Sequence, residues 1–176
     1  MITKKLLLFI FIVVLSFTWS LYASEHYSEG YADELEIAVG FFPEEAELNI
    51  EEHEESTYFL AMKEDEKIGL AGFGRGRGYG GLMELLVAVD IEGDILGYQV
   101  IIHSETEGIG TPVMEENFIS RFVGLNIHDP LEIGEDVDSF SGATVSAEGV
   151  AEAVRNFSDF VIKLHEDDIV ELDIEN

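Results

Sequence analysis

The sequence predicts an α+β fold, an antiparallel sheet with helices packed on one side, preceded by an N-terminal transmembrane or signal helix. The sheet is indicated by two runs of strand character, residues 82–91 and 95–103, which a turn at Glu92-Gly93-Asp94 joins as an antiparallel hairpin. The helical side is indicated by apolar residues at steps of four and three, which share one helix face: Val150, Val154, Phe157, Val161 and Leu164. Such a set of elements is typical of two packed layers.

The N-terminal helix is expected because residues 6–23 carry no charge and follow Lys4 and Lys5. About 18 such residues reach the lower limit for crossing the hydrocarbon core of a membrane. A retained anchor with Trp19 at the outer interface is favoured over a cleaved signal peptide, since residues 21–23 make a mediocre cleavage site. Either way, the remainder of the chain is expected outside the cytoplasm, anchored to the membrane or, after cleavage, secreted or periplasmic.

The composition excludes several classes of function. The chain has no cysteine, which rules out disulfides, thiolate metal sites and iron–sulfur clusters, so redox chemistry would need a bound cofactor. Its 37 acidic and 9 basic residues give a net charge of −28, which disfavours nucleic acid and anionic lipid as partners. The acidic residues are spread along the chain, which favours an adaptation to saline or alkaline surroundings over a docking face for a basic partner.

The remaining elements follow in chain order. Residues 57–62 form an apolar island with strand character, and residues 72–81 are expected to form a glycine-rich loop. Residues 113–123, between a proline and a glycine, are expected to form one short amphipathic helix. The long amphipathic helix is expected to take Ser146 as its N-cap, and the acidic tail 166–176 is expected to be peripheral.

A candidate binding motif, D-S-F-S-G-A-T at Asp138 to Thr144, lies directly before the long helix. The start of a helix presents free N–H groups and a partial positive charge, which suit a phosphate group. The small residues let the backbone approach a ligand closely and deliver the Thr144 hydroxyl to it. The S-G-A-T part alone is also explained by ordinary helix capping.

Asp138 completes the pattern D-x-x-S-G-A-T, which resembles the recognition sequence of ApbE-type flavin transferases. These enzymes join FMN through its phosphate to the threonine hydroxyl. The chain also resembles RnfG- and NqrC-type FMN-binding domains over residues 72–160. The resemblance lies in the order of four features: G-x-G-Y-G-G (76–81), a hairpin, H-S-E-T-E-G-I-G (103–110) and S-G-A-T-V-S. Glu107 departs from this pattern, because the family usually has proline there.

The resemblance implies that FMN is attached to Thr144 by a phosphoester bond. It implies that Asp138 is the residue recognised by the transferase. It also implies that Ser141, Gly142 and Ala143 contact the phosphate or ribityl chain, and that two glycine-containing loops line the isoalloxazine. The complete cofactor-binding set is Thr144 (covalent FMN), Asp138, Ser141, Gly142, Ala143, Ser146, Tyr79, Gly80, Glu105, Thr106, Gly108 and Gly110. No catalytic residue and no metal ligand is expected.

Other interpretations of the same residues are weaker or open. Gly76, Gly78 and Gly81 match the dinucleotide fingerprint G-x-G-x-x-G, but a strand rather than a helix is expected after them. Arg75 and Arg77 would either contact the flavin or neutralise nearby carboxylates. A metal site can be drawn through His103, Glu105 and Glu107, although an ordinary exposed loop explains them better.

The sequence thus predicts an extracytoplasmic electron carrier with covalent FMN, an electron-transfer subunit rather than a self-contained enzyme. The resemblance implies maturation by an ApbE-type flavin transferase and other membrane redox subunits as partners, as in an Rnf-type electron transport complex. The alternatives are a stand-alone exported flavin domain of another reductase chain, or a non-redox acidic binding module. We divide the chain into an anchor or signal segment (1–24), an acidic linker with the first strand region (25–70), an FMN-binding domain (71–165) and an acidic tail (166–176).

Overall fold

The computed structural model describes residues 30–138 and 142–174. The expected membrane segment, residues 1–24, lies outside these ranges, and within them no helix is long and apolar enough to cross a membrane. The chain divides into two compact units, Met1–Leu35 and Glu36–Asn176. Helix α2 (Ala32–Val39) runs across the boundary between them, and the second unit contains the sheet and all later elements.

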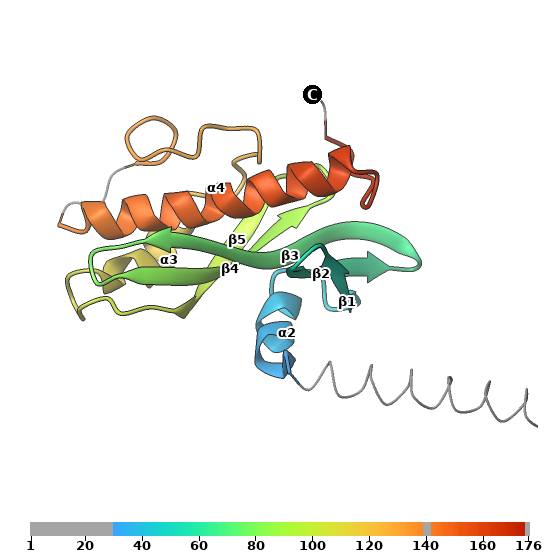
Figure 1. Cartoon of the computed structure of the whole chain (residues 1–176), viewed down its shortest axis with the longest axis horizontal. Helices are drawn as coiled ribbons and strands as arrows, with labels where there is room; N and C mark the ends of the chain where they lie inside the picture. The colour runs from blue at the N-terminus through green and yellow to red at the C-terminus, as the bar shows by residue number, and fades with distance from the viewer. Residues whose placement is uncertain (1–29, 139–141, 175–176) are drawn as a thin grey trace, which may run out of the picture. The chain divides into compact units, whose positions relative to one another are not determined.

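The second unit is built on a five-stranded sheet in which every pair of neighbouring strands is antiparallel (Figure 1). The strands follow one another in chain order as a meander, so each hairpin connects neighbours in space. Residues 47–70, rich in acidic side chains, supply the first strands of this sheet. The strands are β1 (Glu47–His53), β2 (Ser56–Lys63), β3 (Glu66–Arg77), β4 (Leu82–Asp90) and β5 (Ile95–Ile102).

Helix α4 (Thr144–Glu166) lies along one face of the sheet (Figure 1). The five apolar residues predicted to share one face of this helix are all fully buried. They pack with alternate residues of β4, such as Leu85 and Val87, in one hydrophobic core. Two short helical turns, η1 (Thr111–Met114) and α3 (Glu116–Ile119), join the same core through Val113 and Phe118. The predicted antiparallel sheet with helices on one side is therefore confirmed.

The glycine-rich stretch was wrongly predicted as a loop, because most of it belongs to β3. From Gly72 onward every second residue of this strand faces α4, and these positions are Gly72, Gly74 and Gly76. A Cβ at Gly74 would overlap the carbonyl oxygen of Ala153, and one at Gly76 would overlap that of Gly149. The helix lies so close to the strand that no side chain fits between their backbones, and only the turn at residues 78–81 remains as a loop.

The predicted helix over residues 113–123 is also wrong in its extent, because it is interrupted at Glu115. This residue has extended backbone angles, φ −84° and ψ 146°. The buried Tyr98 hydroxyl donates a hydrogen bond of 2.6 Å to the Val113 carbonyl, which would otherwise accept the N–H four residues later in a continuous helix. Burial raises the pKa of the Tyr98 phenol, so the hydroxyl keeps its proton as a donor.

The C-terminal tail is acidic but not peripheral, contrary to expectation. Val170 and Leu172 are buried, whereas the acidic residues beside them, Glu171 and Asp173, are exposed. The Asp173 N–H donates to the Ile91 carbonyl at 2.9 Å, which attaches the tail beyond the end of β4. The alternation of apolar and acidic residues lets one side of an extended segment pack while the other meets water.

The free edge of β3 is covered by side chains of α4. Strand β2 pairs with this strand only as far as Gly72. The Arg77 N–H donates to the Glu152 carboxylate at 2.8 Å, and the Asn156 amide donates to the Arg75 carbonyl at 2.6 Å. These contacts satisfy backbone groups that would otherwise be open to pairing with another chain.

Candidate functional site

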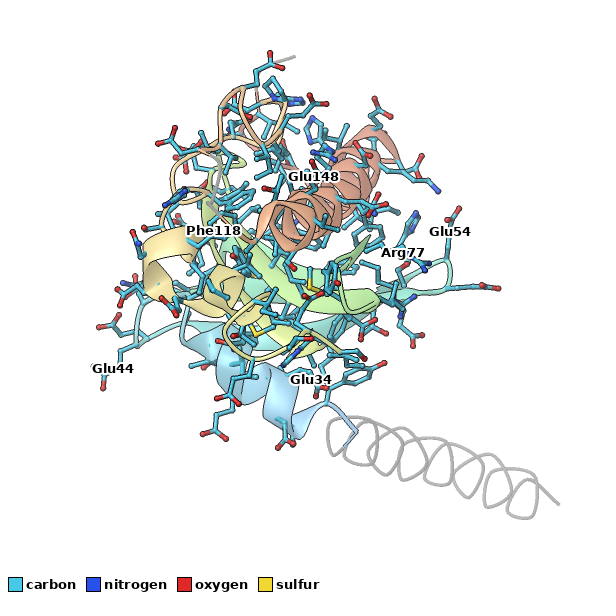
Figure 2. All side chains as sticks on the ribbon, turned by 90° about the vertical axis from the view of Figure 1, so that its left-hand side faces the viewer. Glu34, Glu44, Glu54, Arg77, Phe118 and Glu148 are labelled. Atoms are coloured by element: carbon cyan, nitrogen blue, oxygen red, sulfur yellow. The ribbon has the colours of Figure 1, made fainter. Side chains whose placement is uncertain are left out.

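A hollow of about 380 Å³ opens beside the first turn of α4. Three segments that are distant in sequence meet there: the turn after β3, the loop after β5, and the start of α4. Figure 2 looks onto this end of the domain, with Arg77 of β3 and Glu148 of α4 labelled. The hollow is lined by Tyr79, Ile109, Gly142, Ala143, Thr144, Val145 and Ser146.

Thr144 is the first residue of α4 and is exposed at the hollow. The N-cap position is Ala143, and no side chain among the described residues caps the helix. The first backbone N–H groups of the helix therefore point out of its end without a side-chain acceptor, beside the exposed hydroxyl. A phosphate group suits this arrangement, because it accepts hydrogen bonds from such N–H groups and balances their partial charge.

Ser146 is not the N-cap, contrary to the sequence prediction. It is the third residue of the helix, and its side chain is buried. The helix begins three residues earlier than expected, so the Ser146 hydroxyl points to a partner across the site instead of to its own backbone. It donates a hydrogen bond of 2.7 Å to Oε2 of Glu105.

Glu105 lies behind the hollow rather than in its lining, and is 8% exposed. Its second carboxylate oxygen, Oε1, accepts the Gly80 N–H at 2.9 Å. The carboxylate therefore joins the turn after β3 to the first turn of α4, while its own backbone belongs to the loop after β5.

The loop after β5 is closed by its own hydrogen bonds. The Thr106 carbonyl accepts the N–H groups of Ile109 and Gly110, and the Gly108 N–H donates to Thr111 Oγ1 at 2.9 Å. Gly108 has φ +74°, a left-handed conformation that favours glycine. This geometry projects Ile109 to the surface, with half of its side chain exposed, at the edge of the hollow.

Tyr79 lies at the tip of the turn after β3 and is 68% exposed. The turn is closed by the Gly78 N–H, which donates to the Gly81 carbonyl at 2.9 Å. Together with Ile109 and Val145, Tyr79 gives the hollow exposed apolar walls on three segments. Exposed apolar groups gathered around a concavity are typical of a site that binds a flat, partly apolar ligand.

Several residues singled out in the sequence do not line the hollow. Asp138 is exposed, and its carbonyl accepts a hydrogen bond from Arg121 at 2.8 Å. Ser141 lies outside the described residues. Thr106, Gly108 and Gly110 shape the loop beside the hollow, and Gly80 supports it through Glu105.

The alternative assignments find little support. His103 and Glu107 are exposed while Glu105 points inward, and no group of three or more possible metal ligands occurs among residues 30–138 and 142–174. Arg75 forms an ion pair with Glu84 at 2.5 Å, which agrees with a neutralising role. The glycine fingerprint is followed by strand β4, not by a helix, so a Rossmann site is excluded.

Sequence reasoning missed two lining residues, Ile109 and Val145. Each lies between residues that had been singled out, in E-G-I-G and T-V-S respectively. At Ile109 the missed signal was an exposed apolar residue inside a polar, glycine-containing loop, whereas Val145 lies in the first turn of α4. Loops at the surface usually carry polar side chains, so an apolar one at a tip indicates a binding surface.

Comparison with known proteins agrees with this geometry. Residues 78–159 match the model of the FMN-binding domain family, which spans the turn after β3, the loop after β5 and most of α4. The crystal structure of NqrC from Shewanella oneidensis has the same fold, with a TM-score of 0.53 and 22% identity over 73% of this chain and 72% of that chain. The resemblance to RnfG- and NqrC-type domains is confirmed.

The relatives found by sequence are the G subunits of redox complexes. The G subunit of the ion-translocating oxidoreductase complex of Vibrio vulnificus is 32% identical over 93 residues, which cover 48% of this chain and 44% of that protein. The G subunit of the proton-translocating ferredoxin:NAD(+) oxidoreductase complex of Clostridium ljungdahlii is 28% identical over 104 residues, 56% of each chain. The chain thus spans about half the length of these relatives.

Proposed function

Because residues 78–159 match the FMN-binding domain family, we propose that this protein is an electron carrier that holds FMN covalently through a phosphoester bond to Thr144. The observation that carries the proposal is the position of Thr144. Its exposed hydroxyl lines the hollow at the start of α4, where the N-cap residue is Ala143 and no described side chain caps the helix. The hydroxyl oxygen would become the ester oxygen, and the N–H groups of the first helical turn would hold the phosphate.

The residues of the hollow suit the rest of the cofactor. Tyr79, Ile109 and Val145 present apolar surface from three segments, which would contact the isoalloxazine and exclude water from its faces. Gly142 and Ala143 leave room for the ribityl chain beside the helix start. The flavin would supply the redox chemistry, and the protein fixes its position and surroundings.

We propose that the domain lies outside the cytoplasm, held by the uncharged segment 6–23. Its partners would be other redox subunits of an Rnf-type complex, as the names of the two relatives suggest. An ApbE-type flavin transferase would attach the flavin, with Asp138 as part of its recognition sequence. A covalent bond suits an exported flavoprotein, because a cofactor lost outside the cell is not recovered.

The surface around the hollow also suits electron transfer to a partner. Of eight exposed large apolar side chains among the described residues, five lie at this end. Leu82 begins β4 and Ile102 ends β5, so both flank the hollow beside its three apolar lining residues. Exposed apolar patches of this kind mark protein contacts, which would bring a partner cofactor close to the flavin.

A second candidate is a stand-alone exported flavin domain of another reductase chain, because the family match covers the flavin-binding part alone and names no complex. The chain spans about half of the two related proteins that it matches. Purification of the tagged chain from its native membrane separates the two candidates. Co-purification of other redox subunits supports the complex, whereas recovery of the chain alone supports the stand-alone domain.

The covalent bond is tested by expressing the full chain with a flavin transferase and viewing a denaturing gel under ultraviolet light. We expect a fluorescent band for the wild-type chain and none for Thr144→Ala. Thr106→Ala, which removes an exposed threonine from the loop beside the hollow, is the matched control and should keep the band. Intact mass should show the addition of one flavin mononucleotide group. A wild-type chain without a band, or a Thr144→Ala chain with one, contradicts the proposal.

A further inference from the structure

The buried carboxylate of Glu105 has both of its oxygens engaged by other segments. Oε1 accepts the Gly80 N–H at 2.9 Å, and Oε2 accepts the Ser146 hydroxyl at 2.7 Å. Hydrogen bonds to an ionised carboxylate are about twice as strong as those between neutral groups. One side chain thus holds together the turn that carries Tyr79 and the helical turn that begins at Thr144.

Two glycines show that the backbone has closed around this carboxylate. A Cβ at Gly78 would overlap Oε1 of Glu105, and a Cβ at Gly110 would overlap Oε2. Neither glycine has a positive φ, so their backbone conformations are open to other residues. A side chain at either position would therefore have to push the Glu105 carboxylate out of its place.

Resting on the proposed function, we propose that Glu105 is a positioning residue of the flavin site that sets the separation between Tyr79 and Thr144. It does not line the hollow, and its oxygens point to Gly80 and Ser146. The two residues that it holds are close in sequence to the residues at the flavin. Tyr79 precedes Gly80 by one residue, and Thr144 precedes Ser146 by two. Without the carboxylate, the two walls that hold opposite parts of the flavin are no longer joined to each other.

The first experiment needs no flavin. Amide hydrogen exchange of the apo protein reports whether the Gly80 N–H is held by Glu105. In Glu105→Ala we expect the Gly80 amide to exchange at least about tenfold faster, because its acceptor is gone. In Glu105→Gln the side-chain carbonyl still accepts from Gly80 and the amide donates to Ser146, so most of the protection returns. Glu107→Ala is the matched control, since it removes an exposed carboxylate two residues away in the same loop.

The second experiment uses the flavin-loaded protein, with loading checked by the fluorescent gel band. We expect fluorescence anisotropy to fall in Glu105→Ala, because the FMN phosphate stays esterified to Thr144 while the isoalloxazine moves against a displaced Tyr79. Glu105→Gln and Glu107→Ala should stay close to wild type. Ser146→Ala removes only the hydroxyl donor and keeps the carboxylate, so it tests the same claim by a smaller change. Its anisotropy should lie between those of wild type and Glu105→Ala.

The two proposals fail in different ways. A wild-type chain without a flavin band contradicts the covalent site, whatever Glu105 does. The positioning role is overturned if Glu105→Ala leaves Gly80 exchange unchanged in the apo protein. It is also overturned if loaded Glu105→Ala and Ser146→Ala both keep wild-type anisotropy, or if Glu107→Ala lowers it as much as Glu105→Ala does.

Discussion

In its N-terminal half α4 meets strand β3 backbone to backbone, whereas in its C-terminal half it meets the sheet through large side chains. The first contact places the backbones of Gly149 and Ala153 against the glycines of β3. The second begins at Phe157, whose ring lies over Gly72, and continues through Val161 and Leu164, all fully buried.

The N-terminal half of α4 therefore positions the site, whereas the C-terminal half stabilises the fold. Close contact in the first half brings the start of α4 down to the turn at residues 78–81, so that Thr144 and Tyr79 line one hollow. Burial of the large side chains in the second half stabilises the helix on the sheet. There Phe160 packs against both Tyr58 and Phe157, with ring centroids 5.9 and 6.4 Å away. We therefore expect substitutions in the two halves to separate stability from flavin geometry.

The largest loss of stability is expected from Phe157→Ala. Removing a fully buried aromatic ring lowers the free energy of unfolding by about 3–5 kcal/mol, through lost burial and the cavity left behind. Urea denaturation measures this loss. Phe160→Ala is the matched control, because its half-buried ring should give a smaller loss. The folded fraction of Phe157→Ala should keep wild-type flavin anisotropy, and a lowered anisotropy would show that the two halves are not separable.

A smaller loss of stability, with a larger effect on the site, is expected from Gly76→Ala. The added methyl group overlaps the Gly149 carbonyl, so α4 must move away from β3 at the end where the site lies. Overpacking of this kind lowers the free energy of unfolding by about 1–3 kcal/mol. Flavin anisotropy should fall as well, because Thr144 moves with the helix. In Gly40→Ala the Cβ meets only the Ile37 carbonyl oxygen, at 3.2 Å, so wild-type anisotropy is expected. Unchanged anisotropy in Gly76→Ala would contradict the positioning role of the first half.

Local patterns in the sequence were sufficient to predict the apolar face of α4, which includes its C-terminal half, and the hairpin under it. The buried face of α4 follows from apolar residues at helical spacing, and the β4–β5 hairpin follows from two strand runs around Gly93, which has φ +84°. The motif ending at Thr144, recognised in the same local way, lies at the hollow, and its role there stays a prediction. Each of these signals depends on residues close together in the chain.

The first half could not be predicted, because its residues are explained only by distant partners. Glycine disfavours strands by propensity, so Gly74 and Gly76 indicate a loop until the helix across from them is known. Ser146 looks like a cap until Glu105, 41 residues away, is seen to accept its hydroxyl. The break at Glu115 depends in the same way on Tyr98, which donates to the Val113 carbonyl.

The smallest effect is expected at the far end of α4, where Lys163 donates to Glu54 of the β1–β2 turn at 2.7 Å. Both groups are exposed, so water and salt screen the pair. Lys163→Met should lower Tm slightly in dilute buffer at neutral pH, and the difference should disappear in about 1 M salt. Lys67→Met, an exposed lysine without an ion pair among the described residues, is the control. Neither variant should change flavin anisotropy.

The pH dependence of this pair has a definite sign. The hydrogen bond from Lys163 lowers the pKa of Glu54 below 4.5, so its contribution is complete above pH 4.5 and is lost as the pH falls through the lowered pKa. The hydrogen bond to Glu54 raises the pKa of Lys163 above 10.5, so that contribution is complete below pH 10.5 and is lost as the pH rises through the raised pKa. The Tm difference between wild type and Lys163→Met should therefore be level from about pH 5 to pH 10 and shrink on both sides. A Tm difference that persists in high salt would mean that Lys163 stabilises α4 by packing of its aliphatic chain. The exposed end of α4 would then be held by side-chain packing, like the rest of the C-terminal half of this helix.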